Sequence, residues 1–460
     1  TGESVRRVSD FGYDPGWSPD GTELVVATEA VLDPMGRSGN SHLWAVRTSG
    51  EGKRLVSKGD AVGPRWSPDG RRIAYWGVRP ATWHRDLWTI AADGSGVPLA
   101  LTDDAAVDWG SEWSPDGRRL YFSSNRGGTM NLLRLPIDPR SGTALGAPEP
   151  MTTPAAWTGG LSFAKDGTRF AFGTRDWRTD AWRVAFDPDL EGLQGRPVPI
   201  LRGQSLQELS WSPDGQWLVF TRRGLPWESL GVIRADGGGY SQLTDAAFQH
   251  RAARWAPDGR RIAFQSQRRG GSHVWTIAAD GSALSQLTDG EEVQTPVWSQ
   301  DGRRIAGAVA GGLALIDPAL PSPSQPIETH VIAELRNPIL WGILWSWSPD
   351  SRWLLYTPEE PGGLFLYAFE TRTVRKLDES PEMADWLPDS RRILFNKRGA
   401  LVLLDIVTGR RKEILPPRTL PVDGGWSTFA LTRDGRSIAY LEARREGDIW
   451  LADLGGERNP

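Results

Sequence analysis

The chain has 460 residues, no cysteine, and a formal net charge of −4 from 53 basic and 57 acidic residues. The lack of cysteine excludes disulfides and thiolate metal sites, and the mild charge argues against a nucleic-acid partner. No apolar run reaches the roughly 18 residues that a membrane-spanning helix needs, so no membrane insertion is expected within this chain. The 53 glycines, 34 prolines and 24 tryptophans favour many turns and a repeated unit over long helices.

A five-residue motif, Trp-Ser-Pro-Asp-Gly, recurs along the whole chain. Four copies are intact, five are close variants, and a tenth is degenerate. The nine intervals between first positions average about 46 residues, which is the length of a four-stranded propeller blade. In chain order the copies begin at Trp17, Trp66, Trp113, Phe163, Trp211, Trp255, Trp298, Trp347, Trp386 and Leu431.

Each repeat predicts four consecutive strands, A to D. An extended stretch such as residues 61–65 precedes the motif and forms strand A. The Pro-Asp-Gly turn follows, because Pro fixes φ, Asp hydrogen-bonds its own backbone and Gly accepts positive φ. Strands such as residues 71–75 and 86–90 come next, and a last strand ends in a Gln-Leu-Thr-Asp sequence such as residues 242–245. The motif aspartates are therefore interpreted as turn formers, and most motif tryptophans as packing between blades.

The repeat pattern, clearest at residues 113–126 and 255–289, resembles that of the TolB-like (WSPDG-repeat) β-propeller family. The resemblance covers essentially the whole chain and implies an all-β propeller of four-stranded antiparallel blades. It also implies a protein-binding module of the bacterial periplasm, although similar propellers gate serine peptidases or form the outer parts of membrane receptors.

We expect a single ring of about ten blades over residues 1–460, closed by an N-terminal strand at residues 4–9 that completes the last blade. The alternative is two smaller propellers, because ten blades exceed the usual four to eight. A change of ring would favour a long connection between strands C and D. The candidates are residues 187–198, giving four plus six blades, and residues 318–326, giving seven plus three.

Function is expected on the face that carries the D–A and B–C loops, since variable loops on a rigid scaffold concentrate binding residues. Tryptophan and arginine, which are enriched at binding hot spots, gather in these loops. The candidate binding residues of the D–A segments are Asp108, Trp109, Trp157, His250, Trp341 and Trp426. Those of the B–C loops are Trp83, His84, Arg85, Trp177, Arg178, Trp227, Arg268 and Arg269.

Catalysis finds little support in the sequence. The chain has five histidines, no HExxH motif, and no GxSxG motif followed by a hydrolase pattern. We expect no enzyme activity, no cofactor and no metal, but a binding propeller for a protein or peptide, in the periplasm or outside the cell. The alternatives are a carbohydrate-active propeller (polysaccharide lyase or glycan binder) and a regulatory or sensor ectodomain of a peptidase or receptor kinase.

Overall fold

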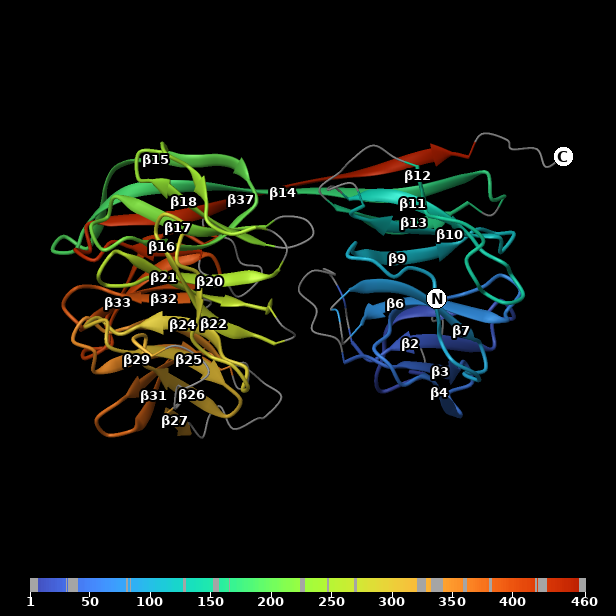
Figure 1. The fold of residues 1–460 in the computed structure, drawn as a ribbon, viewed down its shortest axis with the longest axis horizontal. Helices are drawn as coiled ribbons and strands as arrows, with labels where there is room; N and C mark the ends of the chain where they lie inside the picture. The colour runs from blue at the N-terminus through green and yellow to red at the C-terminus, as the bar shows by residue number, and fades with distance from the viewer. Residues whose placement is uncertain are drawn as a thin grey trace, which may run out of the picture. The chain divides into compact units, whose positions relative to one another are not determined.

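The structure, a computed structural model, describes most of the chain (Figure 1). Its described residues are 7–29, 31, 40–79, 82, 84–126, 130–151, 157–164, 166–223, 228–245, 248–268, 271–320, 328–331, 342–358, 362–379, 383–417, 420 and 428–454. They form 37 strands and no α-helix, which confirms the all-β prediction. In this part of the chain, no helix is long and apolar enough to cross a bilayer.

The chain divides into two compact units. Unit 1 is Thr1–Asp176 with Arg445–Pro460, and unit 2 is Trp177–Arg444. Each boundary falls inside one long strand, β14 (Arg169–Asp187) or β37 (Ser437–Asp453). This division differs from the expected single ring and matches the four-plus-six alternative.

Unit 1 contains three complete sheets, each a meander of four antiparallel strands in chain order. Its strands are β1 (Tyr13–Trp17), β2 (Glu23–Ala27), β3 (Leu43–Arg47), β4 (Lys53–Ser57), β5 (Val62–Trp66), β6 (Arg72–Val78), β7 (Arg85–Ala91), β8 (Leu99–Ala100), β9 (Asp108–Trp113), β10 (Arg119–Ser124), β11 (Asn131–Pro136) and β12 (Glu149–Pro150).

Unit 2 contains five complete sheets of the same kind. Their strands are β16 (Leu206–Trp211), β17 (Trp217–Arg222), β18 (Ser229–Arg234), β19 (Ser241–Gln242), β20 (His250–Trp255), β21 (Arg261–Ser266), β22 (His273–Ala278), β23 (Ser285–Gln286), β24 (Gln294–Trp298), β25 (Ile305–Val309), β26 (Gly312–Ile316), β27 (Glu328–Val331), β28 (Ile343–Trp347), β29 (Trp353–Thr357), β30 (Leu364–Ala368), β31 (Thr373–Asp378), β32 (Met383–Trp386), β33 (Arg392–Lys397), β34 (Ala400–Asp405) and β35 (Arg411–Leu415).

The fourth and tenth repeats exchange their outer strands. Strand β13 (Trp157–Phe163) pairs with the first half of β14, and β36 (Phe429–Leu431) pairs with the first half of β37. Both long strands then continue into the other unit instead of turning back. The second half of β14 pairs with β15 (Gly192–Gln204) and completes the sixth blade of unit 2. The second half of β37 lies beside β14 in the fourth blade of unit 1.

The tenth repeat therefore does not form one blade closed by residues 4–9. Residues 4–6 lie outside the described residues, and residues 7–9 are described without strand structure. The change of unit occurs between strands B and C, at residues 176–177 and 444–445, and not at the C–D connection 187–198. The physical reason is that neither B–C segment makes a reversal, so the strand simply runs on.

The motif turn has the predicted chemistry, as the fifth repeat illustrates. The Ser212 hydroxyl donates to the Asp214 carboxylate at 2.5 Å, and the same oxygen accepts the Gln216 N–H at 3.0 Å. These hydrogen bonds, led by that of Ser212, lower the pKa of Asp214 below its usual value. Gly215 has φ 66°, a conformation that costs glycine little. The motif aspartate is thus a turn former, as expected.

A β-bulge interrupts strand A in most blades. The residue three positions before the motif aromatic has positive φ, and the pairing of strands A and B shifts register there. Glycine occupies this position at Gly63 and Gly110, but unit 2 has Glu208, Ala252 and Thr295 with φ between 47° and 55°. Because a bulge re-aims the neighbouring side chains, it decides which residues of strand A face the centre of the ring.

The motif tryptophans join one sheet to the next. The indole N–H of Trp347 donates to the Val297 carbonyl of the preceding blade at 3.2 Å, and its ring stacks on Phe369 at 4.2 Å. Trp211 donates in the same way to Ala430 at 3.2 Å. Because β36 also contacts β16, this bond closes the six blades of unit 2 into a ring.

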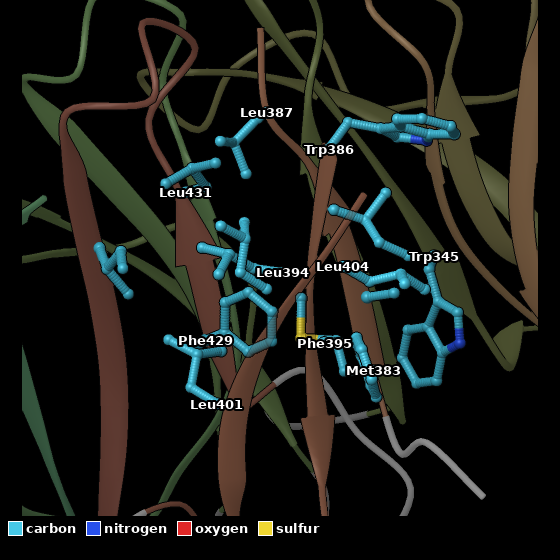
Figure 2. Close-up of a cluster of buried hydrophobic side chains, with 14 of the residues drawn as sticks. Trp345, Met383, Trp386, Leu387, Leu394, Phe395, Leu401, Leu404, Phe429 and Leu431 are labelled. Carbon is cyan, nitrogen blue, oxygen red and sulfur yellow. The ribbon is translucent and has the colours of Figure 1, made fainter. Parts of the chain in front are cut away.

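Figure 2 shows one such interface, where Trp345, Met383, Phe395 and Phe429 converge from neighbouring blades. These side chains are at most 4% exposed. Apolar burial of this kind contributes about 25 cal/mol per Å2 and is repeated at every blade boundary of unit 2 (for example in the clusters around Phe220, Phe264 and Tyr356). The ring is therefore held by sheet-to-sheet packing.

Substitution of Trp347 separates the two parts of its contact. Trp347→Ala is expected to lower the stability of unit 2 by about 3–5 kcal/mol, since it removes a buried aromatic ring. Trp347→Phe keeps a ring against Phe369 and is expected to cost about 1 kcal/mol for the lost hydrogen bond, plus a smaller packing loss. Urea unfolding followed by circular dichroism measures both. Equal losses for the two variants would contradict a contact dominated by packing.

Candidate functional site

A cavity of about 320 Å3 lies at the centre of unit 2. Two sets of six residues line it, with one member of each set from every blade. The first set immediately precedes the motif aromatic and consists of Ser210, Arg254, Val297, Ser346, Asp385 and Ala430. The second set occupies the third motif position and consists of Pro213, Pro257, Gln300, Pro349, Pro388 and Arg433. The cavity is therefore the part of the central channel that reaches the A–B turns.

The regular lining follows from strand geometry. Successive side chains of a strand point to opposite faces, so the motif aromatic of each strand A and the residue before it lie on opposite sides of the strand, and both positions border the cavity. Trp255 and Trp386 are 9% and 5% exposed, and they line the cavity together with the residues before them, Arg254 and Asp385. Of the first set, these two are the charged members.

Arg254 and Asp385 stand on opposite walls of the channel. Arg254 belongs to β20 and Asp385 to β32, so two blades separate them in either direction around the ring. Burial raises the pKa of Asp385, while the N–H groups of Trp386 at 2.9 Å and Leu431 at 3.3 Å stabilise its charge. Burial lowers the pKa of Arg254, and the negative charges of Glu208 and Asp385 oppose that effect.

Glu208 forms a second buried acidic group beside the cavity. Its carboxylate accepts the Thr221 hydroxyl at 2.5 Å and the Ala252 N–H of the next blade at 2.7 Å. The side chain is 2% exposed, and burial raises its pKa. Glu208 thus joins the inner strands β16 and β20. Asp385, and not Glu208, is the acidic residue that lines the cavity itself.

Unit 1 carries charges at the corresponding position of its inner strands. Arg65, which precedes Trp66, lies 3.1 Å from Glu112, which precedes Trp113. Arg65 also lies 3.5 Å from Asp14. In unit 1 the charges before the motif aromatic therefore neutralise each other directly, whereas in unit 2 they face each other across a cavity.

Four predicted site residues of unit 1 lie close together. Arg85 forms a bridge with Val107, which precedes Asp108 and Trp109 in the neighbouring blade. Asp108 is fully buried and is paired with Arg126 at 2.7 Å, and Trp109 packs edge-on against Trp76. These contacts make Asp108 and Trp109 structural members of the blade interface.

His84, the fourth of these residues, belongs to a polar cluster. One ligand atom each of His84, Asp86 and Asp103 lies within 4.8 Å of the others, a spacing that a metal ion could use. The guanidinium of Arg79 already contacts Asp86 at 2.9 Å and Asp103 at 3.4 Å. Because this cation supplies the positive charge that the carboxylates require, the cluster is an arginine-centred ion-pair network.

In unit 2, the predicted residues His250 and Arg268 share one neighbour. The Phe248 ring lies 6.5 Å from the His250 ring and 4.7 Å from the Arg268 guanidinium. His250 is fully buried, and neither ring nitrogen has a hydrogen-bond partner. Burial, assisted by the charge of Arg268, lowers the pKa of His250 to about 4. Arg178 is exposed on β14 and is not brought into this group.

The remaining predicted residues cannot be placed by their side chains. Trp157 belongs to β13 and Trp177 belongs to β14, but the structure does not describe their side chains. The other five predicted residues also lie outside the described residues: Trp83, Trp227, Arg269, Trp341 and Trp426. The binding role of the D–A and B–C face therefore stays a prediction.

Sequence reasoning missed Arg254 and Asp385, which line the cavity at the opposite, A–B end of the channel. The signal was available in the repeat itself. The position before the motif aromatic holds small or apolar residues at Ser210, Val297 and Ala430, and a charge at only some copies. A comparison of that single position across the repeats would have singled out both charged residues.

Repeated four-stranded antiparallel sheets packed around an axis define a β-propeller protein. A family model described as the TolB beta propeller domain matches residues 162–311. The Tol-Pal system protein TolB of Anaeromyxobacter dehalogenans strain 2CP-C is 41% identical over 95 residues, which are 20% of each chain. The chain is thus similar to the TolB-like propeller family over residues 162–311.

Other similarities extend over different shares of the chain. An uncharacterized protein of Agrobacterium fabrum is 30% identical over 126 residues, which are 27% of this chain and 40% of that one. The solved structure of a putative TolB from Agrobacterium tumefaciens is 16% identical, covers 85% of this chain and 94% of its own, and has a TM-score of 0.25. The tricorn protease, also 16% identical, covers 97% and 44% with a TM-score of 0.29. TM-scores of this size do not establish a common arrangement of whole chains.

The buried His250 makes the stability of the protein depend on pH. Its pKa rises from about 4 in the folded state to about 6.5 in the unfolded state, so the unfolded state binds more protons between these values. The stabilisation is fully present above pH 6.5 and is lost as the pH falls toward 4. His250→Leu is expected to remove on the order of 2–3 kcal/mol of this pH dependence.

Urea unfolding at pH 7.0, 5.5 and 4.5 tests this expectation. The exposed His42 provides the matched control, and His42→Gln is expected to keep the pH dependence of the unaltered protein. An identical slope of stability against pH for His250→Leu and the unaltered chain would contradict a buried neutral imidazole.

Proposed function

We propose that the protein is a non-enzymatic binding propeller of the periplasm, and that the central cavity of unit 2 receives a peptide segment of a partner protein. The supporting observation is the placement of Arg254 and Asp385 on opposite walls of a cavity that reaches the A–B turns. Its volume of about 320 Å3 is at the lower end of the roughly 300–1,000 Å3 of ligand pockets.

The chemistry of the cavity suits a short peptide that carries both charges. Arg254 offers planar donors to a carboxylate, with the geometry that guanidinium groups prefer, and Asp385 offers an acceptor to an ammonium or guanidinium group. The proline side chains of the motif turns, such as Pro213 and Pro349, add apolar surface around these charges. The opposite charges of such a ligand would offset the effect of burial on the pKa values of the two residues.

The similarity to TolB proteins supports the same class of function. The matched TolB of A. dehalogenans is named as a protein of the Tol-Pal system, and the present chain matches about a fifth of its length. The proposal for this chain is accordingly limited to peptide or protein binding, with no named partner.

Selection from a random twelve-residue peptide library, followed by fluorescence titration of the selected peptides, tests the proposal. Arg254→Gln and Asp385→Asn are each expected to weaken binding at least tenfold, about 1.4 kcal/mol, because each leaves one charge of the peptide unpaired. Arg303→Gln is the matched control, since Arg303 is an exposed arginine of a motif turn outside the cavity lining. It is expected to leave the affinity unchanged.

The same titrations compare the two ends of the channel. Arg268→Ala alters the D–A and B–C face, where Arg268 contacts Phe248, and leaves the cavity lining intact. Loss of binding in that variant, with full affinity in Arg254→Gln and Asp385→Asn, would move the site to the face predicted from the sequence. Failure to select any peptide, together with turnover of a uronide substrate, would replace the proposal with a carbohydrate-active function.

A further inference from the structure

Each blade of a ring needs a preceding blade for its motif tryptophan. The indole N–H of Trp113 donates at 3.1 Å to the carbonyl of Arg65, the residue before the preceding motif aromatic. Trp347 and Trp211 make the same bond to Val297 and Ala430. The same bond therefore occurs in both units. The motif residues Trp66, Trp255, Trp298 and Trp386 are joined to the neighbouring blade by packing alone, because their buried indole N–H groups have no hydrogen-bond partner.

Trp17 lacks this arrangement. It is the motif tryptophan of the first blade of unit 1 and is 63% exposed, whereas Trp113 and Trp347 are 3% and 5% exposed. Tyr13, on the same strand, is 51% exposed. Within the described chain, β1 makes its extensive contacts with β2 of its own blade and with β5 of the following blade. The first blade therefore presents one half of the repeated interface to solvent.

The fourth blade of unit 1 presents the other half. On one face, Phe170 and Phe172 pack against Leu132 of the third blade, together with Ala452 of β37 and Leu454, which directly follows that strand. Residues of β37 that alternate with these point to the opposite face. Among them, Ile449 is 88% exposed and Leu451 is 67% exposed.

Unit 1 also lacks the closing contact that unit 2 has. In unit 2, β36 contacts β16, whereas β13 makes its extensive contacts with β9, β10 and β11. No contact of comparable extent joins β13 to β1 in the described part of unit 1. The described four blades therefore end in two exposed faces, each of which carries apolar side chains of the kind that pack at the other interfaces.

We propose that a second copy of this chain covers both faces. In each copy, the Trp17 face of the first blade packs against the fourth blade of unit 1 in the other copy. The dimer therefore contains two equivalent contacts. The result is a two-fold symmetric ring of eight blades, which is within the usual range for propellers and closes as cyclic dimers do. A second copy is the occupant because it supplies both missing halves at once.

The repeated interface identifies the contacting atoms. Ser162 precedes the motif aromatic Phe163 and is exposed, so its carbonyl takes the place that Arg65 has for Trp113. The Trp17 indole N–H donates to the carbonyl of Ser162 of the partner subunit. Ile449 and Leu451 supply apolar area beside this bond. The dimer does not depend on the cavity of unit 2, so peptide binding and dimer formation are separable.

Sedimentation equilibrium of the full chain tests the proposal. The unaltered protein is expected to be a dimer at micromolar concentration, and Trp17→Asp and Leu451→Asp are each expected to raise the dimer dissociation constant more than tenfold. Val97→Asp is the matched control, because Val97 is 80% exposed on a turn of the second blade. It is expected to remain dimeric. A monomeric unaltered protein at about 100 μM, or dimers unaffected by both variants, would overturn the proposal.

Mixing the two variants tests the pairing of faces. An equimolar mixture of Trp17→Asp and Leu451→Asp combines one doubly altered interface with one unaltered interface, so heterodimers are expected although each variant alone is monomeric. If the Trp17 faces met each other instead, Leu451→Asp would dimerise alone, and the proposed pairing would be wrong. Matching near-ultraviolet circular dichroism spectra and melting temperatures verify that each variant is folded.

Disulfide trapping provides an independent measurement, since the chain has no cysteine of its own. A chain with Trp17→Cys mixed with a chain with Ser162→Cys is expected to give a covalent heterodimer on a non-reducing gel. A chain that carries both substitutions distinguishes the alternatives. An internal disulfide in a monomer would mean that the four blades close on themselves and would overturn the proposal.

Discussion

The fold depends on one contact, that of a motif aromatic with the neighbouring sheet. A four-stranded sheet alone buries neither face, so each blade is stable only between neighbours. The aromatic ring contributes apolar area to that contact, and the indole N–H groups of Trp113, Trp211 and Trp347 also donate to a carbonyl of the preceding blade. Trp211, whose bond to Ala430 closes unit 2, shows why the ring has a fixed number of blades.

Much of the fold could be predicted from the sequence because its determinants are local. The Ser-Pro-Asp-Gly turn, the alternating strand after it and the interval of about 46 residues all act within one repeat. The number of rings could not be predicted in this way, since the exchange of strands between two blades leaves the interval unchanged. The informative detail was an absence of turn residues at 174–180 and 441–446, where glycine or proline punctuates most other B–C connections.

The candidate site was predicted less well, for a related reason. Aromatic and arginine side chains in loops attract attention by their composition, but Trp109 and Arg126 are used in packing and ion pairs within unit 1. Arg254 and Asp385 are single residues within regular strands, and only their position relative to the motif distinguishes them. Their importance comes from the six-fold repetition of that position around an axis, which no single segment of sequence contains.

The exchange of β14 and β37 also sets an order for biosynthesis. The fourth blade of unit 1 contains residues 169–175 and residues 447–453, so its last strand leaves the ribosome about 270 residues after its second. At about 5–20 residues per second, the nascent chain carries an incomplete sheet for tens of seconds. Its edge can pair with other strands during that time. Both propellers are thus completed by the same final segment, and a chain truncated before residue 437 would contain two unfinished propellers.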